Sequence, residues 1–96
     1  MKYFHRTSLA PDSVLAEADN HFGALLQAVG TEHRARSYEG SLGRVTVRVA
    51  AEGGHYTLID VSTDQVGESE ADTVAKRFLA LVHARVDPTH QMRGAY

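Results

Sequence analysis

Cysteine is absent from this chain, and its absence removes several kinds of chemistry at once. Without a thiol there is no disulfide bond, no thiolate ligand for a metal and no cysteine nucleophile within these residues. A sequence without disulfides fits a reducing compartment, so we predict a cytoplasmic location.

Long apolar segments are lacking as well. No apolar run approaches the roughly 20 residues that cross a bilayer, and residues 1–7 lack the apolar core of a signal peptide, so we expect no membrane partner. Two prolines, 43% apolar residues and 23% charged residues are typical of a globular chain. We expect a single domain over residues 1–88, followed by a flexible tail over residues 89–96.

Recognisable catalytic arrangements are missing too. The serines lie in no nucleophile elbow, and Ser69 is explained by helix capping. The glycines fall at expected turns between strands, which argues against a phosphate-binding loop between a strand and a helix. Asp60 lies within an expected strand, and we interpret it as an ion-pair partner of Arg44 and Arg48 rather than as an acid or base. We predict no catalytic residue and favour a non-enzymatic role.

Histidine, by contrast, is plentiful, with six residues. A metal site on a helix needs ligands three or four residues apart, and no two histidines have that spacing. The nearest sets of potential ligands are Glu17 with His21, and His83 with Asp87 and His90. A proline breaks the helix inside the second set. We therefore interpret the histidines as scattered surface residues and predict neither a metal nor a cofactor.

The clearest positive pattern lies between residues 44 and 63. Residues 44–49 alternate arginine or threonine with valine, and a second β-favouring run over residues 56–63 follows Gly53-Gly54. The alternation is typical of a half-buried antiparallel strand, and two glycines suit the positive φ angles of a tight turn. We predict a β-hairpin that buries its valine face.

Amphipathic helical patterns flank this hairpin on both sides. The first begins at Pro11, and its apolar stripe continues to Val29. The second begins after Ser69, with Asp72 as a capping-box partner, and ends before Pro88.

Two further short strands are predicted, over residues 2–8 and 34–39. The element order is then β-α-β-β-β-α. Each helix must bury its apolar stripe, and the valine face of the hairpin is the large surface that can receive both. We predict an α+β two-layer sandwich, with an antiparallel sheet of three to four strands and two helices on one face.

The face of the sheet turned away from the helices is the candidate functional surface. On the hairpin, the residues that alternate with the buried ones face outward. One side of the preceding strand is assigned to the same face. The candidate binding residues are Arg34, Arg36, Tyr38, Arg44, Arg48, Tyr56, Leu58 and Asp60.

Three interpretations of this face remain open. It is a solvated surface, or one half of a homodimer interface, where tyrosine and arginine are enriched. Alternatively, it stacks bases and pairs with phosphates. A net charge of −2 is not the basic footprint of a dedicated nucleic-acid binder, so nucleic acid is the least favoured partner.

The expected helix–three strands–helix order, together with Gly67-Glu68-Ser69 and Ala75-Lys76, resembles the double-stranded-RNA-binding domain. The resemblance implies a lysine cluster that grips phosphates at the start of the last helix. This chain has Glu68, Glu70 and Asp72 there instead. The resemblance is therefore one of topology and does not extend to RNA binding.

Our leading hypothesis is a non-enzymatic binding or assembly module that acts as a homodimer. The alternative is a small-ligand-binding or enzymatic domain with a pocket between the sheet and the last helix. Its expected lining is Tyr56, Asp60, Phe78 and Val82. A cavity between these two layers distinguishes the hypotheses.

Overall fold

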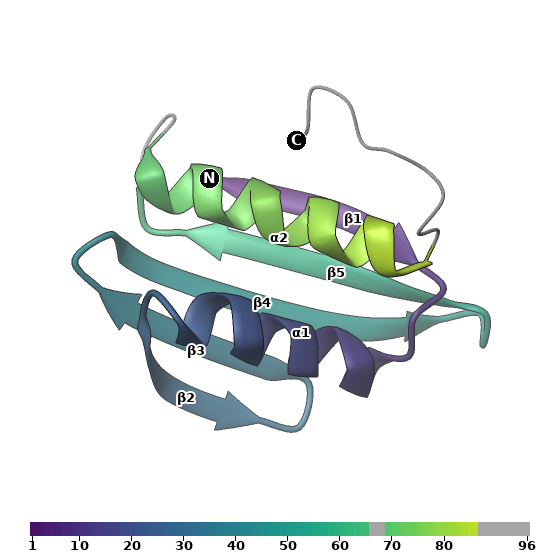
Figure 1. Cartoon of the computed structure of the whole chain (residues 1–96). Coiled ribbons are helices and arrows are strands. Elements are labelled where there is room, and N and C mark those ends of the chain that lie inside the picture. Colours follow the sequence, from purple (N-terminus) through teal and green to yellow (C-terminus); the bar gives the residue numbers. More distant parts are fainter. Residues whose placement is uncertain (66–68, 87–96) are drawn as a thin grey trace.

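One antiparallel sheet and two helices make up the described part of the chain, residues 1–65 and 69–86 of a computed structural model (Figure 1). In chain order the elements are β1 (Lys2–Thr7), α1 (Pro11–Gly23), β2 (Gln27–Glu32), β3 (Ala35–Gly40), β4 (Gly43–Glu52), β5 (Tyr56–Thr63) and α2 (Glu70–Val86). The expected tail, residues 89–96, lies outside the described residues. Within them, no helix is long and apolar enough to cross a membrane.

The strand order across the sheet is β1-β5-β4-β3-β2, and every neighbouring pair is antiparallel. Both helices lie on one face: α1 packs mainly on β3 and β4, and α2 mainly on β1 and β5 (Figure 1). This arrangement confirms the predicted α+β class with both helices on the same side. No described helix covers the other face of the sheet.

The core forms between the two layers because β4 and β5 alternate strictly. Val45, Val47 and Val49 point inward from β4, and Thr57, Ile59 and Val61 point inward from β5. Burying a valine or isoleucine side chain contributes about 1.5–3 kcal/mol relative to leaving it exposed, and the hydroxyl of Thr57 donates to the carbonyl of Leu9. The predicted hairpin is confirmed, and its turn uses Gly53 and Gly54 at φ angles of 61° and 75°. Such angles strain other residue types.

The first helix is shorter than its apolar stripe predicts, and the sheet is correspondingly larger. Helix α1 ends at Gly23 rather than near Val29, and the backbone N–H groups of Leu25 and Leu26 both donate to the carbonyl of Phe22. The following residues form β2, which pairs with the edge of β3. The sheet therefore has five strands, not three to four.

This extra strand also changes the connection between the helices. Four strands separate α1 from α2, and β1 extends the sheet at the other side of β5. The topological resemblance to the double-stranded-RNA-binding domain, with three strands between two helices, is therefore lost.

Asp72 ties the start of α2 to two strands. Its backbone N–H donates to the hydroxyl of Ser69 at 3.3 Å, which confirms Ser69 as the helix cap. Its completely buried carboxylate accepts hydrogen bonds from the hydroxyls of Ser69 (2.6 Å), Tyr3 (2.8 Å) and Thr63 (3.1 Å). Burial acts to raise the pKa of Asp72, but these three donors outweigh it and the pKa is lowered.

Replacing Asp72 with Asn should destabilise the fold most strongly at neutral pH. The amide places a donor against hydroxyl donors, and we expect a loss of about 1–3 kcal/mol. The pKa of Asp72 is lower in the folded state than in the unfolded chain, where it is about 3.9. The ionised carboxylate therefore makes its full contribution to stability at pH values above about 3.9. That contribution is lost as the pH falls through the folded pKa, so the difference between variant and wild type should narrow. Urea unfolding at pH 7 and pH 3 measures both effects.

Glu70→Gln is the matched control, because it removes one carboxylate from the same helical turn at an exposed position. We expect a change of less than about 0.5 kcal/mol for this variant. Equal losses for the two variants at pH 7 would contradict the role assigned to the Asp72 carboxylate.

Candidate functional site

The candidate functional site is the sheet face opposite the helices, called the outer face below. The register of the five strands determines which side chains share it. From β1 to β2, its residues are Lys2, Phe4 and Arg6; Tyr56, Leu58, Asp60 and Ser62; Arg44, Thr46, Arg48, Ala50 and Glu52; Ala35, Ser37 and Glu39; and Gln27, Gly30 and Glu32.

Five of the predicted site residues lie on this face: Arg44, Arg48, Tyr56, Leu58 and Asp60. Leu58 is half-buried and pairs in register with Ala50 on one side and Arg6 on the other. The alternation of the hairpin was sufficient to predict these positions.

The predicted placement on the outer face is wrong for the remaining three residues, Arg34, Arg36 and Tyr38. Tyr38 pairs with Val45 and Arg36 pairs with Val47, so both side chains belong to the inner face. Tyr38 is completely buried, with its ring 5.2 Å from that of Phe22. Arg34 precedes β3, and its guanidinium lies 3.8 Å from the carboxylate of Asp12 on α1.

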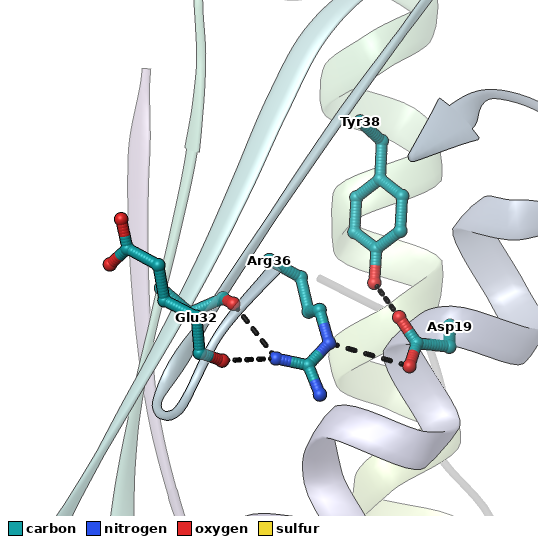
Figure 2. A network of polar contacts seen from close by, with 5 residues as sticks. Asp19, Glu32, Arg36 and Tyr38 are labelled. Carbon is teal, nitrogen blue, oxygen red and sulfur yellow. Dashed lines mark hydrogen bonds and ion pairs between the residues drawn. The ribbon is translucent and has the colours of Figure 1, made fainter. Parts of the chain in front are cut away.

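Arg36 and Tyr38 join β3 to α1 through Asp19, as Figure 2 shows. The Tyr38 hydroxyl donates to one carboxylate oxygen of Asp19 at 2.7 Å, and Arg36 Nε donates to the other at 3.4 Å. Arg36 Nη1 also donates to the backbone carbonyls of Ala35, at 2.9 Å, and of Glu32. A buried phenol needs such a partner, and the polar atoms of both side chains are engaged in contacts within the fold.

The ion pairs on the outer face also differ from the predicted ones. Arg44 lies 3.6 Å from Glu39, and Asp60 Oδ2 lies 3.8 Å from the Nζ atom of Lys2. Asp60 therefore pairs with neither Arg44 nor Arg48. Within the described residues, Asp60 Oδ1 is buried and has no hydrogen-bond partner.

The aromatic side chains of the outer face lie on its β1–β5 half, and a hollow lies on its β2–β3 half. Phe4 and Tyr56, on β1 and β5, are 59% and 57% exposed. On β2 and β3 the corresponding residues include Gly30, Ala35 and Ser37, which border a hollow of about 40 Å³ together with Glu32 and Arg48. Phe4 was not among the candidate residues predicted from the sequence. Alternation along β1 would have indicated it, because Phe4 faces the side opposite to its neighbours Tyr3 and His5.

The pocket expected between the sheet and α2 does not have its predicted lining. Tyr56 and Asp60 lie on the outer face, whereas Phe78 and Val82 are completely buried in the core on the other side. These four side chains cannot border one cavity. The described surface does carry an open cleft of about 400 Å³ beside α2, bordered by Leu25, Leu42, Glu70, Thr73, Val74 and Arg77.

Three histidines are partly buried between the sheet and the helices, and not fully exposed as expected. Nε2 of His21 lies 2.9 Å from the carbonyl oxygen of Val74. The rings of His5 and His83 lie 6.1 Å apart, and burial together with His83 lowers the pKa of His5. Within residues 1–65 and 69–86, no three histidine or carboxylate side chains converge as a metal site.

No protein-family model matches the chain, and none of the curated proteins is significantly similar to it in sequence. Functional inference therefore depends on the geometry and chemistry of the outer face.

Replacing Tyr38 with Phe should destabilise the fold by about 1 kcal/mol, because the hydrogen bond to Asp19 is lost. Burial and the Asp19 carboxylate raise the pKa of Tyr38 above its usual value, so its phenol should stay neutral while exposed tyrosines ionise. The stability that this shift provides is present below about pH 10 and is lost as the pH rises further. Ultraviolet titration and urea unfolding measure the two effects.

Tyr56→Phe is the control, because Tyr56 is exposed on the outer face. It should leave stability unchanged and leave the late-ionising phenol in place. An unchanged late-ionising phenol in the Tyr38→Phe variant would refute the assignment.

Proposed function

We propose that this chain is a non-enzymatic assembly module that forms a homodimer through its outer face. The observation that carries the proposal is the exposure of Phe4 and Tyr56, beside half-buried Leu58, on a sheet face that no described helix covers. The opposite face is packed by both helices. A second copy of the chain is always present as a potential partner, and its binding would bury this apolar surface.

The size of the outer face is compatible with a dimer interface. Five strands at a spacing of about 4.8 Å, each six or more residues long, give a flat area of roughly 500 Å². Side-chain relief makes the accessible area larger than the flat one. Standard interfaces bury about 800 Å² per partner, so a small to standard interface fits this face.

The two edges of the sheet are less suited to self-association than its face. The register of β2 shifts between Ala28 and Gly30, which marks a bulge or irregularity on that edge strand. Edge strand β1 carries Lys2 and Arg6. Bulges and charged residues are the usual devices that prevent edge-to-edge pairing.

A nucleic-acid partner is less well supported than a second copy. Arg36 and Tyr38 are engaged with Asp19 and are not available to phosphates or bases. The outer face also carries Glu32, Glu39 and Asp60, whose charges would repel a phosphate backbone.

Replacing Leu58 with Asp should abolish dimerisation, because a carboxylate would be placed in the apolar part of the interface. We expect the wild-type protein to have twice the monomer mass at micromolar concentration and the variant to have the monomer mass. Light scattering behind a sizing column measures both.

Leu81→Asp is the matched control, since Leu81 is 45% exposed on α2, in the helical layer. This variant should remain a dimer. A wild-type monomer at high micromolar concentration would overturn the proposal, and so would a dimer that Leu81→Asp disrupts and Leu58→Asp does not.

A further inference from the structure

We infer that the two copies meet around a two-fold axis parallel to β4, with β1 of each copy lying over β2 of the other and β5 over β3. This inference depends on the proposed homodimer. It specifies how the second copy is oriented and which residues favour that orientation.

The strand order limits how two outer faces can be stacked. A closed pair of identical sheets, packed face to face, requires a two-fold axis in the plane between them. Because β4 is the middle strand, an axis along β4 exchanges β1 with β2 and β5 with β3. An axis across the strands instead places each strand over its own copy.

Charge favours the axis along β4. The outward residues of β1 include Lys2 and Arg6 and no acid, whereas those of β2 and β3 include Glu32 and Glu39 and no base. Exchange of the two sides brings β1, with Lys2 and Arg6, over β2, with Glu32. With Asp60 counted, the outward residues of β1 and β5 have a net charge of +1, and those of β2 and β3 have −2. An axis across the strands would instead bring like charges together.

Shape favours the same axis. Phe4 and Leu58 project from the β1–β5 half, while the β2–β3 half has Gly30 and Ala35 beside its hollow. The axis along β4 keeps the height of each residue along the strands, so Phe4 of each copy comes over Glu32 of the other, at the border of the hollow. The axis across the strands would set large against large and small against small, which leaves gaps.

On the middle strand, this arrangement brings like charges together. Arg48 lies on β4 and approaches its counterpart in the other copy. Asp60 lies directly opposite Arg48 on the neighbouring strand β5, so its carboxylate is close to Arg48 although the two form no ion pair. Arg48 makes no ion pair within the described residues, so its side chain is available to turn toward either Asp60.

The test reverses the charges on one side of the outer face and then on both. Lys2→Glu with Arg6→Glu makes both sides acidic, and Glu32→Lys with Glu39→Lys makes both sides basic. We expect each double variant to dimerise about tenfold or more weakly than the wild type. The quadruple variant restores opposite charges across the interface and should recover an affinity close to that of the wild type. Sedimentation equilibrium at low salt measures the dissociation constants.

The quadruple variant separates the contacts between copies from those within one chain. Lys2 pairs with Asp60, Arg6 with Glu52 and Glu39 with Arg44 in the same chain, and the quadruple variant loses all three pairs. Its recovery therefore cannot come from them. Thermal unfolding followed by circular dichroism shows that each variant is folded.

Two results would overturn the inferred orientation. One is a quadruple variant that dimerises no better than the double variants, and the other is a set of double variants with wild-type affinity. Either result would leave the proposed homodimer standing if Leu58→Asp still abolished it. A wild-type monomer would instead remove the proposed function itself.

Discussion

The pairing of β4 with β5 is the constraint on which the rest of this structure depends. Val47 lies opposite Val61, so the apolar side chains of both strands point to the same side and receive both helices. A slip of one residue would turn the valines outward and the arginines into the core. The same register determines what remains on the outer face, where residues of both charge signs stand among exposed apolar ones.

Parts of the fold could be predicted because local patterns and long-range packing agree there. The alternation of β4 is unambiguous, and Gly53 and Gly54 adopt the positive φ angles that their sequence suggests. Ser69 and Asp72 mark the start of α2 by a contact within one turn. In these places the short-range interactions are sufficient to specify the structure.

The end of α1 could not be predicted because the apolar spacing continues past it. Leu25, Leu26 and Val29 match a helical stripe, yet they lie beyond the last helical residue, Gly23. Residues 27–32 pair with β3 instead, and a single-sequence pattern does not reveal that pairing. Leu26 is buried in the core, whereas Leu25 and Val29 are exposed.

Which side of β3 faces the core could not be predicted from the sequence for a similar reason. The sequence of β3 has no run of alternating aliphatic residues, so either side could face the core. The choice is made by Asp19, whose carboxylate receives the Tyr38 hydroxyl from 19 residues further along the chain. This contact removes Tyr38 and Arg36 from the candidate site. The exposed Phe4 then becomes the main aromatic residue at the β1 side of the outer face.

Intermolecular nuclear Overhauser effects would detect a second copy on the outer face at the level of single residues. A sample mixed from isotope-labelled and unlabelled protein reports contacts between copies only. We expect contacts from the Phe4 ring and the Leu58 methyls of one copy to the Ala35 methyl of the other. Intermolecular contacts confined to the helical layer, or none at millimolar concentration, would contradict this expectation.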